Sequence, residues 1–148
     1  MIKEREKNMA TLNIVYYTGT GNTGEMAKYI GEGAENAGAT VKLINVEEAD
    51  ESAVDADFIA FGSPAVGAEE IAPEMVEFFE GIKDKIVGKT VGLFGSYDWG
   101  QGGWMDTWRE EIINEGLSVV NDGLIIHLAV DDDEKIEKCK EYGRAIVG

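Results

Sequence analysis

The chain has 148 residues, of which 44% are hydrophobic, and this length and composition predict one packed domain and exclude a disordered protein. Asp and Glu number 29 against 13 Lys and Arg, so the formal net charge is −16. Such a charge excludes binding to nucleic acid or anionic membranes and favours partners with basic surfaces, unless it serves solubility alone. One cysteine excludes an intramolecular disulfide. With no signal peptide or membrane-length apolar run, we expect a cytoplasmic protein.

Residues 1–10 are charged, show no periodicity and precede the first apolar run. A central strand needs no such arm, so we expect either a disordered N-terminal arm at 1–10 or a natural start at Met9. Residues 11–148 are then predicted to form a single domain.

Five apolar segments alternate with helical patterns along that domain. The first, Leu12–Tyr17, predicts a buried strand, and a helix follows it. One face of this helix carries apolar residues at helical spacing: Met26, Ala27, Ile30, Ala34 and Ala37. Alternating polarity in Thr40–Val46 is typical of a strand at a sheet edge, and the acidic stretch Glu47–Ala56 predicts a turn or a short helix.

The short apolar segment Phe58–Gly62 predicts a third, buried strand, and Ser63–Ile71 predicts a loop. Pro73 favours a helix start at that point. We expect this helix to end at Gly88, with an inward face made of Met75, Phe79, Ile82 and Ile86.

Thr90–Ser96 predicts the fourth strand, and a helix follows from Trp104 to Glu115. Leu117–Leu128 contains a fifth strand, which we expect to be uninterrupted, and Asp131–Val147 forms the last helix, with Cys139 in its apolar face as a small core residue. Strands that alternate with helices predict a parallel sheet with right-handed crossovers. In such sheets ligands bind beyond the carboxyl ends of the strands.

The loop after the first strand consists of Thr18, Gly19, Thr20, Gly21, Asn22 and Thr23. It lacks the Lys with which a Walker A loop reaches the outer phosphates. Two glycines separated by one residue, Gly19 and Gly21, also begin a dinucleotide fingerprint. Its hydroxyls, side-chain amide and backbone N–H groups precede a helix N-terminus and favour a single phosphate monoester, bound without a cation. The alternative is a turn between strand and helix that merely happens to be rich in glycine.

The loop after the fourth strand carries Trp99 next to Asp98. An exposed tryptophan is costly unless it covers something flat, so we expect Trp99 either to stack on a planar ring or to pack on a neighbouring loop. Trp104 and Trp108 fall within a helical pattern and are predicted to pack in the core or on the flank of the helix. His127, the one histidine, is expected to be structural or at the surface, because it has no nearby partners for a metal site.

Three segments in this order resemble the flavin-binding loops of the short-chain, clostridial-type flavodoxins: Thr18–Thr23, Ser63–Glu70 and Gly95–Met105. The resemblance extends over nearly the whole chain, and a fifth strand without an insertion is typical of the short-chain class. It implies an α/β fold in which a doubly wound, five-stranded parallel sheet of order 2-1-3-4-5 forms the middle of a flavodoxin-like three-layer sandwich. It also implies FMN, bound non-covalently.

The resemblance assigns roles to residues of the three loops. The FMN phosphate would be bound by the first loop, through Thr18, Thr20, Asn22 and Thr23 and the backbone at Gly19 and Gly21. Trp99 would stack on one face of the isoalloxazine ring, Val66 would cover the other, and Glu69 would accept a hydrogen bond from flavin N3. The Gly67–Ala68 peptide would turn over on reduction. Further contacts would come from Ser63, Pro64, Ala65, Ser96, Tyr97, Asp98 and Gly102.

Two positions depart from the family's pattern. Close relatives tend to have Met where this chain has Val66, so one face of the ring would lose a flexible, polarisable cover. They usually have Gly in place of Asp98, whose carboxylate would oppose formation of the anionic hydroquinone if it faced the ring. We expect the Asp98 side chain to point to solvent instead.

The resemblance implies a low-potential one-electron carrier that shuttles FMN between neutral semiquinone and anionic hydroquinone, with no catalytic residues and no metal. Redox partner proteins would dock through basic surfaces on its acidic face, and it would act as a monomer. The alternative is a flavodoxin-fold reductase that oxidises NAD(P)H, although the chain shows no clear extra loops for a nicotinamide site. A receiver-type signalling module is rejected, because Ser63 stands where its phosphoacceptor Asp would be.

Overall fold

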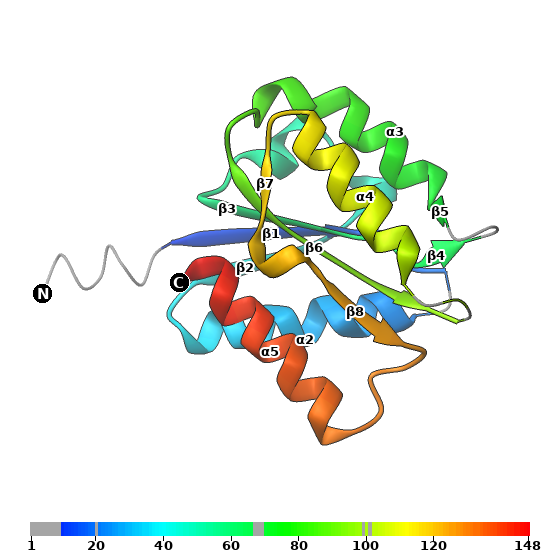
Figure 1. Ribbon diagram of the computed structural model, residues 1–148. Helices are drawn as coiled ribbons and strands as arrows, with labels where there is room; N and C mark the ends of the chain where they lie inside the picture. The colour runs from blue at the N-terminus through cyan, green and yellow to red at the C-terminus, as the bar shows by residue number, and fades with distance from the viewer. Residues whose placement is uncertain (1–9, 20, 67–69, 99, 101) are drawn as a thin grey trace, which may run out of the picture.

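The computed structural model describes residues 10–19, 21–66, 70–98, 100 and 102–148. The main sheet is parallel, and helices cover both of its faces (Figure 1). This arrangement confirms the predicted three-layer α/β fold. Within the described residues, no helix is long and apolar enough to cross a membrane.

Three buried strands form the centre of the sheet: β1 (Thr11–Tyr16), β3 (Phe58–Gly62) and β6 (Thr90–Tyr97). β1 pairs with β3 and β3 pairs with β6, all in parallel. β2 (Thr40–Asn45) pairs with the other side of β1 and forms one edge of the sheet, where Leu43 is exposed. The order β2-β1-β3-β6 confirms the predicted order of the first four strands.

The fifth position of the sheet is divided between two short strands, β7 (Ser118–Val119) and β8 (Leu124–His127), which both pair in parallel with β6. A 3-10 turn, η4 (Val120–Asp122), separates them. Asn121 and Asp122 have φ values of 46° and 61°, in the left-handed region that an extended strand does not include. Our prediction of an uninterrupted fifth strand is therefore wrong, although its place in the sheet is as expected.

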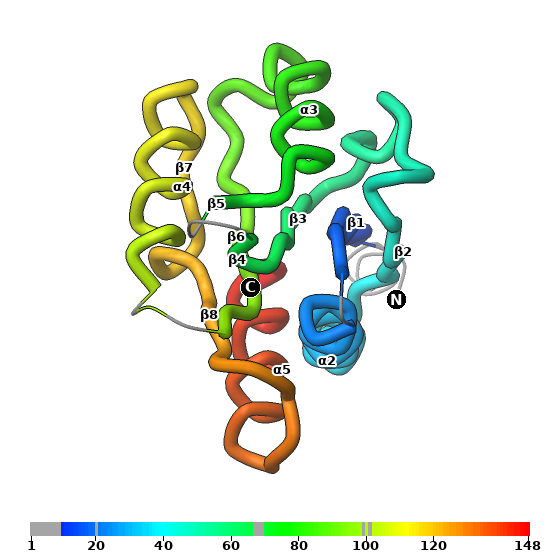
Figure 2. The backbone as a smooth tube through the Cα atoms, turned by 90° about the vertical axis from the view of Figure 1, so that its right-hand side faces the viewer, coloured from blue at the N-terminus to red at the C-terminus, as the bar shows by residue number. Residues whose placement is uncertain are grey.

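In the described part of the chain, two α-helices cover each face of the sheet. α2 (Asn22–Asn36) and α5 (Asp133–Val147) lie on one side, and α3 (Pro73–Ile82) and α4 (Gly103–Asn114) lie on the other (Figures 1 and 2). Each pair of helices encloses its own apolar core against the sheet. Cys139 is fully buried in the core under α2 and α5, as predicted, and burial raises the pKa of its thiol to about 12.

The connection between β2 and β3 forms two 3-10 helices, η1 (Val46–Glu48) and η2 (Glu51–Val54), in agreement with the predicted turn or short helix. The side chain of Asp50 accepts a hydrogen bond from the backbone N–H of Ser52 at 2.9 Å and caps the second of them.

The helix ends differ in detail from the sequence-based expectations. Ala37 is exposed, because α2 ends one residue before it. α3 ends at Ile82, not at Gly88, and a 3-10 turn, η3 (Lys83–Lys85), follows it. Ile86 is buried as predicted but lies outside the helix.

The close approach of α2 and α5 depends on two glycines that face each other's backbone. A Cβ added at Gly33 would overlap the carbonyl oxygen of Lys140, and one added at Gly143 would overlap that of Ile30. Because these obstacles are main-chain atoms, no side-chain rotation relieves the overlap, and the helices would have to move apart.

Gly143→Ala is therefore expected to lower the free energy of unfolding by about 2 kcal/mol or more, despite the higher helix propensity of alanine. Urea unfolding of the apoprotein measures this. Gly81→Ala is the matched control, because a Cβ at Gly81 in α3 meets nothing within 4 Å. It should be neutral or stabilising by up to about 1 kcal/mol. Equal behaviour of the two variants would show that the helices do not touch at Gly143.

Candidate functional site at the carboxyl ends of the strands

Loops follow β1, β3 and β6 at the same edge of the sheet, because these strands run in parallel and end side by side (Figure 2). The backbone N–H of Tyr17 donates to the Gly62 carbonyl at 3.0 Å, and that of Ser63 donates to the Phe94 carbonyl at 3.1 Å. The bases of the three predicted flavin loops are thus brought together in the order in which their strands lie.

The first loop is closed by the hydroxyl of Thr18. Its oxygen accepts hydrogen bonds from the backbone N–H groups of Gly21 (3.0 Å) and Gly24 (3.2 Å). Gly21, with a φ of 100°, precedes α2 and leaves no side chain in front of the helix N-terminus. The N–H groups of Asn22 and Thr23 have no acceptor among the described residues.

These donors fit a phosphate monoester, since all of them are uncharged and they lie at the positive end of a helix dipole. The half-buried Asn22 adds a side-chain amide, and Gly19 and Gly21 are exposed. Thr20, to which we also assign a phosphate contact, lies outside the described residues.

Thr23 and Ser96 link the first and third loops beneath the rim. Both are buried, at 1% and 4% exposure, and their hydroxyl oxygens are 2.8 Å apart, within hydrogen-bonding distance. The Ser96 N–H also donates to Thr23 Oγ1 at 3.4 Å. The Thr23 hydroxyl thus contacts β6, and its predicted phosphate contact remains a prediction.

The second loop is folded around Ser63. The Ser63 hydroxyl is fully buried, donates to the Pro64 carbonyl at 2.9 Å and accepts from the Ala72 N–H at 2.9 Å. Between these points the chain forms an antiparallel hairpin of β4 (Ala65–Val66) and β5 (Glu70–Ile71). The sequence predicts only a loop over Ser63–Ile71, so this hairpin is a difference from the expectation.

Ala65 and Val66 are half-buried in this hairpin and Glu70 is exposed. Gly67, Ala68 and Glu69, which connect β4 to β5, lie outside the described residues. The peptide flip and the flavin N3 contact that we assign to them therefore stay predictions.

The third loop leaves β6 at Tyr97, which is half-buried, and reaches α4 at its N-cap, Gly102. Asp98 is exposed, consistent with the expectation that its side chain points to solvent. The Asp98 carbonyl accepts a hydrogen bond from Nε2 of His127 at 2.9 Å. Trp99, the predicted stacking residue, lies outside the described residues.

Trp104 and Trp108 are buried, at 4% and 3% exposure, with nearly parallel rings whose centroids are 6.4 Å apart. They belong to the core between α4 and the sheet, which confirms the prediction that they pack there.

The sequence matches known proteins over most of its length. A family model for flavodoxins matches residues 14–143. The chain belongs to the flavodoxin family. Its sequence is 38% identical over 136 residues to the flavodoxin of Megasphaera elsdenii, a match that covers 90% of this chain and 96% of that one. It is 39% identical over 137 residues to the flavodoxin of Clostridium beijerinckii, with 91% and 98% covered.

The fold comparison agrees. The solution structure of two-electron reduced Megasphaera elsdenii flavodoxin superposes on this chain with a TM-score of 0.81 and 40% identity, and the match covers 92% of this chain and 98% of that one. The predicted resemblance and the predicted cofactor are thereby confirmed: flavodoxins are FMN-binding electron-transfer proteins.

His127 is the residue at this rim whose contact the sequence reasoning missed. The sequence predicts a structural or surface role for His127, and the side chain is exposed as expected. Its position at the end of the last strand was the one available signal, since that strand ends at the same rim as the flavin loops.

The link between Thr23 and Ser96 makes a quantitative prediction for the apoprotein. Thr23→Val keeps the shape of the side chain but leaves the Ser96 hydroxyl buried without its partner, which should cost about 1–3 kcal/mol of unfolding free energy. Ser96→Ala should cost a similar amount, and the double variant less than the sum of the two. Urea unfolding of all four proteins measures the coupling. Strictly additive losses would show that the two hydroxyls do not bond.

Proposed function

We propose that this chain is a low-potential, one-electron carrier that holds FMN at the rim formed by its three loops and alternates between the one-electron-reduced and two-electron-reduced forms of the cofactor. The main support for the proposal is the first loop, which places uncharged hydrogen-bond donors at the N-terminus of α2. Two further loops of flavodoxin type lie beside it. We further propose that it acts as a monomer in the cytoplasm and catalyses no reaction of its own.

In this proposal the first loop binds the FMN phosphate, and the second and third loops enclose the isoalloxazine ring, with Val66 on one side and Trp99 on the other. FMN supplies the electron-transfer chemistry when bound. The chain's own contribution is to bind the ring in one orientation, to limit its contact with water and to set the free energy of its charge states.

The net negative charge of the protein supports a low reduction potential for bound FMN. The formal net charge of −16 raises the free energy of any additional negative charge on the cofactor, and the neutral phosphate site contributes no compensating cation. Glu70 in the second loop and Asp98 in the third are exposed, so part of this charge lies at the rim itself.

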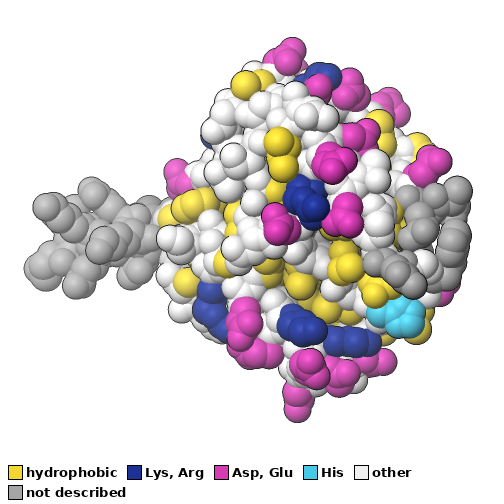
Figure 3. All heavy atoms as spheres, viewed as in Figure 1, with side chains coloured by type: hydrophobic (Ala, Val, Ile, Leu, Met, Phe, Trp, Pro, Cys, Tyr) yellow, Lys and Arg dark blue, Asp and Glu magenta, His cyan; other side chains and the backbone are white. Residues whose placement is uncertain are grey.

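The same charge favours basic partner surfaces. Carboxylate side chains are spread over the helices of the face seen in Figure 3, with fewer Lys and Arg among them. A groove of about 470 Å³ runs between α3 and α4 and begins at the second loop. Its acidic lining consists of Glu70, Glu80, Glu111 and Glu115.

Stepwise anaerobic reduction of the FMN-loaded protein tests the carrier function. We expect most of the FMN to pass through a one-electron-reduced form, seen as long-wavelength absorbance that free FMN in the same buffer does not develop. NADPH alone should not be oxidised. Direct two-electron reduction with turnover of NADPH would replace the carrier by the alternative, a flavodoxin-fold reductase.

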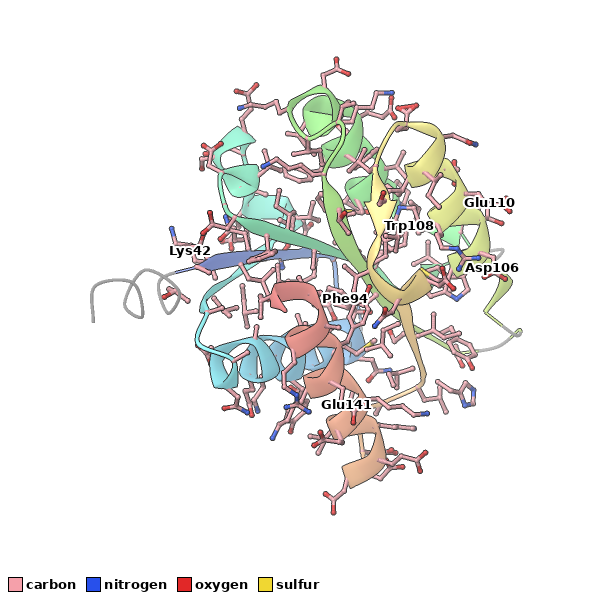
Figure 4. The ribbon with its side chains drawn as sticks, turned by 60° about the vertical axis from the view of Figure 1, so that its left-hand side comes forward. Lys42, Phe94, Asp106, Trp108, Glu110 and Glu141 are labelled. Atoms are coloured by element: carbon pink, nitrogen blue, oxygen red, sulfur yellow. The ribbon has the colours of Figure 1, made fainter. Side chains whose placement is uncertain are left out.

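The position of the docking charges is tested with cytochrome c, a basic haem protein, as the electron acceptor. Glu70 and Glu111 line the groove beside α4, whereas Glu141 projects from α5 in the opposite layer (Figure 4). Glu70→Gln and Glu111→Gln should each slow electron transfer at low ionic strength by roughly twofold, and added salt should remove the difference.

Glu141→Gln is the control, since it changes net charge by the same unit on the other side of the sheet. An equal effect of all three substitutions would show that total charge, and not a docking surface at α4 and the second loop, determines the rate.

A further inference from the structure

We propose that His127 is a positioning residue for the third loop, whose imidazole holds the Asp98 carbonyl and so prepares the loop to receive the flavin. The inference rests on the proposed FMN-binding function and names a residue outside the three flavin loops on which that binding depends. Three observations support it: the fixed backbone of His127, the contact of its side chain, and the place of that contact in the loop.

The backbone of His127 is fixed at the end of β8. Tyr97 and His127 lie opposite each other in the register of β6 and β8, and the next residue, Leu128, donates its N–H to the Tyr97 carbonyl at 2.8 Å. Lys135 Nζ, from the first turn of α5, donates to the carbonyls of His127 (3.0 Å) and Ala129 (3.1 Å). The imidazole therefore projects from a base that is tied to both the sheet and α5.

The side chain reaches the third loop directly. Its ring lies against that of Tyr97, with centroids 5.1 Å apart, and its Nε2 is 2.9 Å from the Asp98 carbonyl oxygen. A carbonyl oxygen only accepts hydrogen bonds, so Nε2 carries the proton and donates. In the described part of the loop, positions 98, 100 and 102, no other side chain makes a hydrogen bond from a different element.

The hydrogen bond from His127 is made to the residue that directly precedes Trp99, the proposed stacking residue. The Asp98 carbonyl belongs to the peptide group that joins Asp98 to Trp99, and a peptide group is planar. Fixing its oxygen restricts the direction in which the chain leaves Asp98 toward the proposed stacking residue. The loop then loses less conformational entropy when the flavin binds. The dissociation constant for FMN is lower as a result.

Two substitutions of His127 distinguish the effect of its N–H donor from the effect of its aromatic ring. His127→Phe keeps an aromatic ring against Tyr97 but has no N–H, whereas His127→Gln loses the ring but presents an amide N–H at about the same reach. Both lie on an exposed residue, so neither removes a buried core contact. Urea unfolding of each apoprotein checks that the fold is kept.

The experiment titrates unsubstituted, His127→Phe and His127→Gln apoproteins with FMN and follows the quenching of flavin fluorescence. The expected result is a dissociation constant about 3- to 10-fold higher for His127→Phe, as for the loss of one solvent-exposed hydrogen bond, and a value close to the unsubstituted protein for His127→Gln. The visible circular dichroism of bound FMN should change in the Phe variant and not in the Gln variant.

Unchanged affinity in His127→Phe, or an equal loss in both variants, would overturn the inference, because the donor would then not be the group that matters. If the unsubstituted apoprotein failed to bind FMN, the proposed function itself would be refuted, and the inference with it. These outcomes are distinguished by the titration of the unsubstituted protein.

Discussion

The parallel pairing of β1 with β3 and of β3 with β6 is the constraint on which the rest of this structure depends. Parallel strands need long crossovers, and the chain therefore leaves each of these strands at the same end of the sheet. The three loops that leave β1, β3 and β6 are consequently neighbours, although they lie far apart in the sequence. Because the strands are buried on both faces, their relative register does not slide, and the loop bases stay at fixed separations.

Hydrogen bonds from short hydroxyl side chains fix the three neighbouring loops in place. Thr18 closes the first loop onto α2, Ser63 closes the second loop, and Thr23 contacts Ser96 across 73 residues of sequence. A hydroxyl can donate one hydrogen bond and accept two, so each of these residues can satisfy neighbouring backbone groups without bringing a charge into the site. A site built in this way holds an anion by geometry and by the helix dipole, and the protein's own negative charge remains uncompensated there.

Much of this was visible in the sequence, because glycine- and threonine-rich loops after apolar strands are local signals. The edge character of β2 and the burial of Cys139, Trp104 and Trp108 followed from polarity patterns in the same way. The break in the fifth strand was missed even though Asn121-Asp122-Gly123 is a turn-forming sequence, because the apolar residues on both sides suggested one continuous strand. The hairpin in the second loop has strands of two residues, too short for any alternation to show.

The contacts that the sequence did not reveal are long-range polar ones. The bond from Thr23 to Ser96 and that from His127 to Asp98 depend on strand register and on side-chain direction, which no local pattern encodes. Family resemblance identifies loop residues by their motifs, but it does not say which of them point at the ligand and which at each other. In this chain, hydrogen bonds between elements that are distant in sequence show which of these residues contact one another.

The break between β7 and β8 also affects how copies of this protein meet. The strands at the fifth position form a free border of the sheet, and a long, flat border offers a row of unpaired backbone groups to another chain. Here the left-handed residues of η4 bend that border after two residues of β7, and Tyr142 ties the bend down by donating to the Val120 carbonyl at 2.8 Å. At the opposite border, β2 presents exposed Lys42. The sheet thus has interrupted or charged borders on both sides, which disfavours pairing with the sheet edge of another chain.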